Sequence, residues 1–206
     1  MWVIVYAVLL EKFCMRKIIV FLLFAFVTLL VEGQQDTSLI NRLNAVLNFT
    51  KLKQHDKVMD YTYPKVFTVI PREQFNELIK SLYDTDDFSS VLDSVKVDSI
   101  FTIVKINDAR YAIVRYSMLM KMKYKEPITK KDADLLVPGM EQQFGEGNVR
   151  FVKATNSLHV FIISYMIAIK DEISPKWTFI DFDLKNPAFV ENILGKEVIA
   201  KLKEYN

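Results

Sequence analysis

Hydrophobic and polar residues alternate along this chain with two different periods, which divide it into a helical part and a strand part. Between residues 38 and 83, most apolar residues recur every three or four positions, the spacing of one face of an α-helix. From about Val95 onward they recur every second position, which is typical of β-strands. The pattern therefore predicts an α+β domain in which N-terminal helices pack on one face of a curved antiparallel sheet and enclose a cone-shaped interior.

The helical part predicts three helices, of which the first and the third have a complete apolar face. The first begins at Ser38, whose hydroxyl can cap it. The third begins at Pro71, because the N–H that proline lacks would be unpaired at a helix start anyway. A short helix over residues 56–61 and a brief strand over residues 66–70 lie between them. The two apolar stripes consist of Leu39, Leu43, Val46 and Leu47, and of Phe75, Leu78, Ile79 and Leu82.

The strand part predicts two long hairpins, a closing strand and a C-terminal helical extension. The expected strands are residues 96–106, 110–123, 149–154, 158–170 and 177–183. Thr129 and Asp132 resemble a capping box for a helical insert between the hairpins, which Pro138 interrupts and Gly145 ends. A pair of helices that begins at Asn186 completes the domain.

The start of the chain has the pattern of a secretory signal. Residues 18–31 form an apolar run of 14 residues, broken only by Thr28, with Arg16 and Lys17 directly before it and Gly33 after it. A membrane-spanning helix needs about 20 apolar residues, so this run is too short to be one. We therefore expect cleavage near Gly33, export to the periplasm or the extracellular space, and a single domain over residues 34–206 without a stable membrane span.

A second apolar run, residues 1–10, precedes the signal pattern and leaves alternatives open. Met15 begins an orthodox signal by itself, so it is a candidate for the true start of the protein. An uncleaved anchor that uses both runs is the alternative, although the charged residues between them argue against one continuous span. Cys14, the one cysteine of the chain, precedes the apolar run, so the exported domain would have no disulfide bond.

Composition and charge exclude several classes of protein. Hydrophobic residues make up 51% of the chain, which is enough for a core and excludes a disordered protein. The formal net charge of +2 gives no reason to expect a nucleic-acid partner. The chain contains no dinucleotide fingerprint, phosphate-binding loop, zinc-protease motif or nucleophile elbow, and we expect no cofactor.

Residues 56–71, with the sequence DKVMDYTYPKVFTVIP, and residues 176–182, with the sequence KWTFIDF, carry a family resemblance. With the order of the elements between residues 38 and 183, they resemble the nuclear transport factor 2-like superfamily, the cystatin-like cone of polyketide cyclases and ketosteroid isomerases. The chain is also similar to exported proteins of unknown function that join this cone to a signal peptide. The resemblance implies a pocket between helices and sheet, but it assigns no catalytic residue, because no family motif can be aligned to an acid or base here.

Three methionines and two histidines are the residues whose chemistry could mark a site. Met118, Met120 and Met122 share one strand face, and thioethers suit Cu(I), but apolar neighbours on that face favour a core, so we expect no metal. His55 lies in a polar run and is expected to be solvated. His159 alternates with apolar residues and could be a general base if a carboxylate, with Asp181 as the candidate, orients it.

These residues support three functions. The leading hypothesis is a non-enzymatic protein that binds a small apolar ligand or a protein partner through the cone. The second is an isomerase- or cyclase-like enzyme with Asp181 or His159 as its general base, and the third is a module that forms a homodimer through its open sheet face. The residues expected to line the pocket are Tyr116, His159, Phe161, Tyr165 and Asp181.

Overall fold

The computed structural model describes residues 36–205, and residues 38–205 lie within one compact unit. The expected signal segment, the alternative start at Met15 and Cys14 lie outside the described residues. Within the described part, no helix combines the length and the apolar character that crossing a membrane requires.

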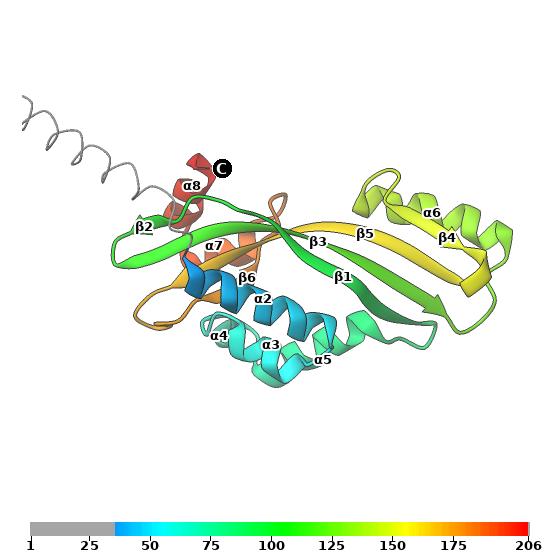
Figure 1. Cartoon of the computed structure of the whole chain (residues 1–206), viewed down its shortest axis with the longest axis horizontal. Coiled ribbons are helices and arrows are strands. Elements are labelled where there is room, and N and C mark those ends of the chain that lie inside the picture. The colour runs from blue at the N-terminus through cyan, green and yellow to red at the C-terminus, as the bar shows by residue number, and fades with distance from the viewer. Residues whose placement is uncertain (1–35, 206) are drawn as a thin grey trace, which may run out of the picture. The chain divides into compact units, whose positions relative to one another are not determined.

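The described strands form one open antiparallel sheet (Figure 1). They are β1 (Phe88–Ile100), β2 (Val104–Ile106), β3 (Ala109–Tyr124), β4 (Val149–Val152), β5 (Ser157–Lys170) and β6 (Thr178–Asp181). β3 and β5 pair along almost their whole length at the centre of the sheet. β1 and β2 pair with the outer edge of β3, and two β-bulges interrupt the β1 ladder. β4 and β6 pair with the two ends of the outer edge of β5, and they leave the middle of that edge uncovered.

The described helices are α2 (Thr37–Lys51), α3 (His55–Tyr61), α4 (Val66–Val69), α5 (Arg72–Tyr83), α6 (Lys130–Phe144), α7 (Ala188–Leu194) and α8 (Lys196–Glu204). The capping box at the start of α6 is present as predicted, and Gly145 ends this helix with a φ of 99°, which favours glycine. α6 continues through Pro138, which the sequence had predicted to interrupt it. Together, helices and sheet confirm the α+β class.

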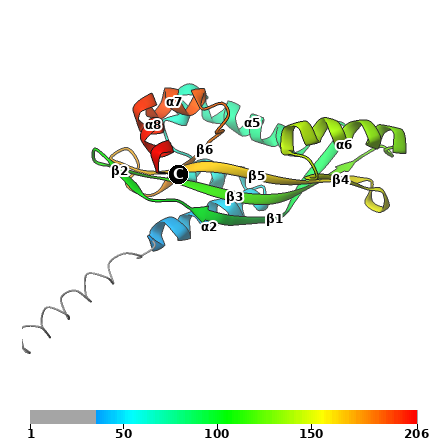
Figure 2. The ribbon, with the colours of Figure 1, turned by 90° about the horizontal axis from the view of Figure 1, so that it is seen from above.

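Helices cover both faces of the sheet at the end where β6 pairs with β5. Side chains of a strand point alternately to the two faces, and those of β3 enter two different cores. Tyr111 and Ile113 pack with buried residues of α7 and α8, whereas Ala112 and Val114 pack with the buried stripe of α2. Figure 2 shows α2 on one side of the sheet and α7 and α8 on the other. The C-terminal helices are therefore an additional layer, on the face opposite α2.

Besides α6, the structure differs from the sequence-based prediction in three elements. The strand expected over residues 96–106 is divided into the end of β1 and β2, with residues 101–103 between them outside any strand. Residues 66–69 form the short helix α4 and not a strand, because the Val66 N–H bonds back to the Tyr63 carbonyl at 2.9 Å and turns the chain. The β-branched residues of this segment favour strands, and the local turn overrides that preference. β1 begins at Phe88, earlier than predicted from the alternation of apolar and polar residues. The prediction missed the first half of this strand because it contains many polar residues.

Hydrogen bonds of the buried Tyr63 connect the segment between α3 and α4 to the edge of β6. The Tyr63 N–H donates to the Phe179 carbonyl at 2.9 Å, and the Tyr63 hydroxyl donates to Asp171 Oδ2 at 2.6 Å. Asp171 also accepts from the Ser174 N–H, so the bond joins the helical part to the β5–β6 turn.

We expect Tyr63→Phe to lower the free energy of unfolding by about 1.5–3 kcal/mol, the usual contribution of a hydrogen bond to a charged group. Urea denaturation measures the change. Tyr165→Phe is the matched control, because no hydrogen bond of the Tyr165 hydroxyl occurs among the described residues, and it should change the free energy of unfolding little. Equal losses in both variants would contradict the prediction.

Candidate functional site

A cavity of about 230 Å³ lies at the end of β6, between that strand and the helices α2, α3 and α5. α2 contributes the C-terminal end of its apolar stripe, and α3 contributes the side chains of one of its faces. α7 contributes a single aromatic ring. The residues that line the cavity are Val46, Leu47, Thr50, His55, Val58, Tyr61, Thr62, Val66, Phe75, Ile79, Leu82, Tyr83, Tyr116, Met166, Phe179, Ile180, Asp181 and Phe189. The lining is mostly apolar with a few polar groups, which is the composition of small-molecule sites.

The strand register explains how a tyrosine and an aspartate meet in this cavity. Tyr116 of β3 lies opposite Ser164 of β5, and Met166, two residues further along β5, lies opposite Asp181 of β6. Directly paired residues point to the same face of a sheet, so these side chains share the face that α2 covers. The Tyr116 hydroxyl donates to Asp181 Oδ1 at 3.1 Å.

The two members of this pair differ in their exposure to water. Tyr116 is buried, whereas Asp181 is exposed to solvent through the cavity that it lines. Desolvation raises the pKa of the Asp181 carboxyl, and the hydrogen bond from Tyr116 offsets only part of the rise. Desolvation, with the neighbouring Asp181 charge second, also raises the pKa of Tyr116 well above its ordinary value. Among the described residues, Asp181 forms no salt bridge, and no lysine or arginine lines its cavity.

The described part of the protein buries the apolar stripe of α5 only in part. The stripe of α2 is buried as predicted, but no side chain of α5 is buried. Leu78 remains 51% exposed and Leu82 63% exposed, while Phe75 and Ile79 are half-buried. Since Phe75, Ile79 and Leu82 line the cavity and Leu78 does not, an occupant of the cavity would cover all of this stripe except Leu78.

His55 and Tyr83 form one wall of the cavity near charged surface residues. Their rings lie 5.6 Å apart, and Lys53 forms a salt bridge with Asp84 at 3.1 Å beside them. The pKa of His55 is lowered, first by desolvation and then by the positive charges of Lys80 and Lys53. His55 is partly exposed, so it keeps the contact with solvent that the sequence led us to expect, and it also lines the cavity. Its polar sequence neighbours gave no signal of a cavity, because the ring contact is made with a residue 28 positions away.

The structure brings together two of the five residues expected to line the pocket. Tyr116 and Asp181 meet in the cavity, whereas His159, Phe161 and Tyr165 lie on the opposite face of β5 and do not line it.

His159 pairs with Lys121 across the strands, and its pKa is lowered by partial burial and by the charges of Lys121 and Arg150. Asp181 pairs with Met166, seven residues along β5 from His159, so it cannot orient that imidazole. Phe161 is exposed and lies directly opposite Leu119 of the neighbouring strand.

The three methionines of β3 behave as the core interpretation predicted. Met122 is buried and Met120 packs with it against α6, whereas Met118 packs with the α2 core. Among the described residues, no group of three or more His, Cys, Asp or Glu side chains could hold a metal ion.

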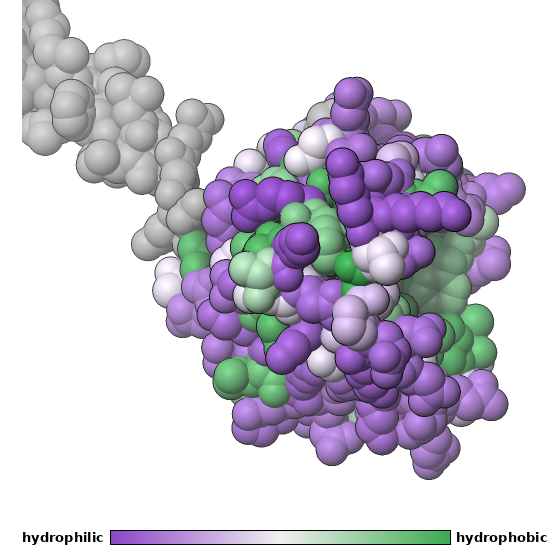
Figure 3. All heavy atoms as spheres, turned by 90° about the vertical axis from the view of Figure 1, so that its right-hand side faces the viewer, coloured by the Kyte–Doolittle hydropathy of each residue, from purple (hydrophilic) through white to green (hydrophobic). Residues whose placement is uncertain are grey.

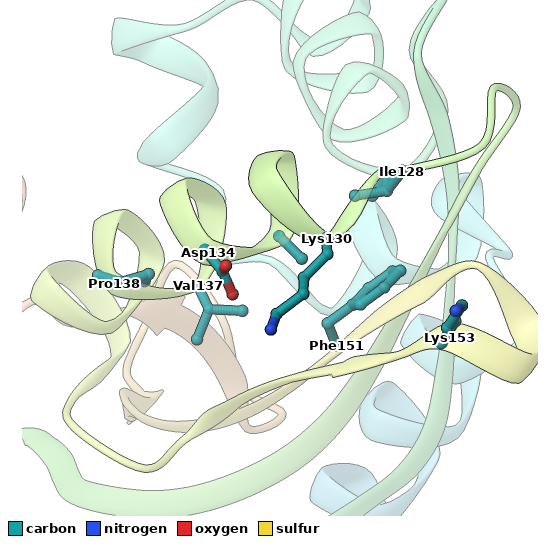
Figure 4. A pocket seen from close by; sticks show the side chains of 8 residues that line it. Ile128, Lys130, Asp134, Val137, Pro138, Phe151 and Lys153 are labelled. Atoms are coloured by element: carbon teal, nitrogen blue, oxygen red, sulfur yellow. The ribbon is translucent and has the colours of Figure 1, made fainter.

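A second cavity, of about 410 Å³, lies between α6 and β4 (Figure 4). Lys130 extends from the start of α6 over the cavity, toward the space between Val137 and the ring of Phe151. Lys130, Asp134 and Lys153 line it and are all exposed, so no buried polar group points into it. Figure 3 shows that hydrophilic side chains cover most of this end of the molecule, with hydrophobic atoms visible in a hollow between them. This cavity is therefore a weaker candidate for a ligand-binding site than the cavity at Asp181.

No protein-family model, curated protein or solved structure matches the chain. The resemblance to the nuclear transport factor 2-like superfamily consequently stays a prediction.

Proposed function

We propose that this protein is exported and binds a small, largely apolar molecule in the cavity at the end of β6. The observation that carries the proposal is the apolar stripe of α5, which lines a cavity and is only partly packed by the protein: Phe75 contacts the core, whereas Leu82 remains 63% exposed. An amphipathic helix normally buries such a stripe against a core. A bound molecule would supply the missing contacts, and the Tyr116–Asp181 pair would orient its polar group.

The size of the cavity limits the enclosed part of the ligand to one ring or a short chain. A protein cavity of about 150 Å³ accommodates benzene. The volume of about 230 Å³ therefore accommodates a ring with a short substituent, and any larger part of a ligand would extend out of the cavity.

Filling the cavity should abolish binding. Val58 lines it from α3, and Val58→Trp places an indole ring in the space of the ligand. We expect the unmodified chain to bind toluene saturably in an NMR titration, and Val58→Trp to bind it about tenfold more weakly or worse, a loss of at least about 1.4 kcal/mol.

Val69→Trp is the matched control, because Val69 of α4 is 53% exposed and does not line the cavity. This variant should bind toluene like the unmodified chain. Toluene binding that persists in Val58→Trp would refute the proposal, and so would an unmodified chain that binds neither toluene nor a benzene ring with a polar substituent.

An isomerase- or cyclase-like enzyme is the second candidate, and the position of Asp181 favours it. A general base needs a carboxyl with a raised pKa in a cavity that a substrate can enter, and Asp181 meets both conditions. Exchange of the α-protons of phenylacetone with deuterium, followed by NMR, tests this activity. An enzyme would accelerate the exchange, and Asp181→Asn would remove the acceleration; equal rates with and without the protein would exclude it for this substrate.

A further inference from the structure

We infer that the ligand of this cavity is an organic ammonium ion, whose charge lies against Asp181 and whose body lies among the aromatic rings. The inference rests on the proposed function and specifies the class of molecule bound.

The charge of the lining is negative and unbalanced. Asp181 is the one acidic side chain among the described lining residues, and no lysine or arginine lines the cavity. Tyr116 occupies Oδ1 of Asp181, while no hydrogen bond to Oδ2 occurs within the described part of the chain. An ammonium group would donate to this free oxygen and would also neutralise the charge that the cavity desolvates.

The aromatic residues of the lining are suited to a cation. The faces of aromatic rings attract positive charge, and the attraction increases in a desolvated site. Two of these rings already attract cations of the protein: the Arg42 guanidinium lies 4.1 Å from the ring centre of Tyr61, and the Lys53 ammonium 5.4 Å from that of Tyr83. The lining rings are those of Tyr61, Phe75, Tyr83, Tyr116, Phe179 and Phe189.

Other ligand classes fit these groups less well. An anionic molecule would bring a second negative charge beside Asp181, which costs free energy because no cation lines the cavity. A neutral alcohol can donate one hydrogen bond to Oδ2, but it leaves the charge unbalanced. A purely apolar molecule would separate the carboxylate from water and offer it no partner.

Three compounds of similar size and different charge test the inference on the full chain. Benzylamine is a cation at neutral pH, benzyl alcohol is neutral and benzoate is an anion. We expect calorimetric titration to show benzylamine binding at least about tenfold more tightly than benzyl alcohol, from the charged hydrogen bond and the cation–π contacts, with benzoate the weakest.

Asp181→Asn should remove this preference and bind benzylamine and benzyl alcohol with similar affinity. Asp183→Asn is the matched control, since it makes the same change in net charge at an exposed position two residues away that does not line the cavity. It should retain the preference, and circular dichroism of both variants verifies that they are folded.

The outcomes separate the two levels of the hypothesis. If neither these compounds nor toluene binds, the proposed function fails and the inference fails with it. If benzyl alcohol or benzoate binds as tightly as benzylamine, the cavity is a ligand site but the ammonium class is wrong. A preference for benzylamine that survives Asp181→Asn would also overturn the inference, because Asp181 would not be its cause.

Discussion

Asp181→Asn is expected to make the empty protein more stable at neutral pH than the unmodified chain. Because its pKa is raised in the folded state, Asp181 binds a proton more tightly in the folded than in the unfolded protein. Folded-state stability therefore falls as the pH rises from the unfolded pKa through the folded one, and the loss persists at neutral pH. Asparagine still accepts the hydrogen bond from Tyr116 and carries no charge, so the variant avoids this loss.

Urea denaturation between pH 3 and pH 7 measures the effect. The difference in the free energy of unfolding between the variant and the unmodified chain should be small at the acid end and should increase in favour of the variant above the ordinary aspartate pKa. Water that reaches Asp181 through the cavity limits the size of the gain.

Asp183→Asn serves as the reference for the loss of one negative charge at an exposed site. It should show no comparable increase with pH. If Asp181→Asn were less stable than the unmodified chain at neutral pH, the carboxylate would be stabilised by its surroundings, and the description of an unbalanced charge would be wrong.

Leu43→Ala is expected to lower the free energy of unfolding by about 3–5 kcal/mol, which is a large part of the stability of a domain of this size. Leu43 has no exposed surface, and it packs between α2 and the β3–β5 face of the sheet. The substitution removes most of an apolar side chain and leaves a space that the surrounding strands cannot close. Thermal and urea denaturation followed by circular dichroism measure the loss.

The same substitution at Leu135 of α6 is the control, because this leucine is 69% exposed. The two variants have the same change in helix propensity, so their difference reports burial alone. Leu135→Ala should change the free energy of unfolding by less than about 0.5 kcal/mol. Losses of equal size would mean that α2 does not pack on the sheet as described.

Elements whose pattern has one dominant period could be predicted from the sequence. The stripe of α2, the capping box of α6 and the paired strands β3 and β5 all follow from the spacing of apolar residues and from the turn and cap residues between them. The first half of β1 could not be predicted, because polar and apolar residues occur there in adjacent pairs, as in Ser89–Ser90 and Val91–Leu92, and do not alternate. Its pairing with β3 is a tertiary effect that local propensity does not contain.

The candidate site could be predicted only in part, because β5 carries apolar residues on both faces. Alternation shows that His159 and Phe161 share a face, but it does not show which face meets the cavity. The strand predicted over residues 177–183 indicated that Asp181 lies near the core. In the structure Asp181 accepts a hydrogen bond from Tyr116, and not from His159. His55 and Tyr83 reach the cavity through the packing of α3 against α5, for which the sequence has no periodic signal.

The free edges of this sheet have a consequence for self-association. On the β5 side, β4 and β6 pair with the two ends of the strand and leave only a few residues of its edge unpaired. Two of these residues, Phe161 and Tyr165, each form one main-chain hydrogen bond with a neighbouring loop. On the β1 side, the two bulges break the regular row of donors and acceptors that an incoming strand would need. Edge strands of 13 and 14 residues would otherwise be templates for the addition of further strands, so we expect these interruptions to disfavour edge-to-edge polymerisation.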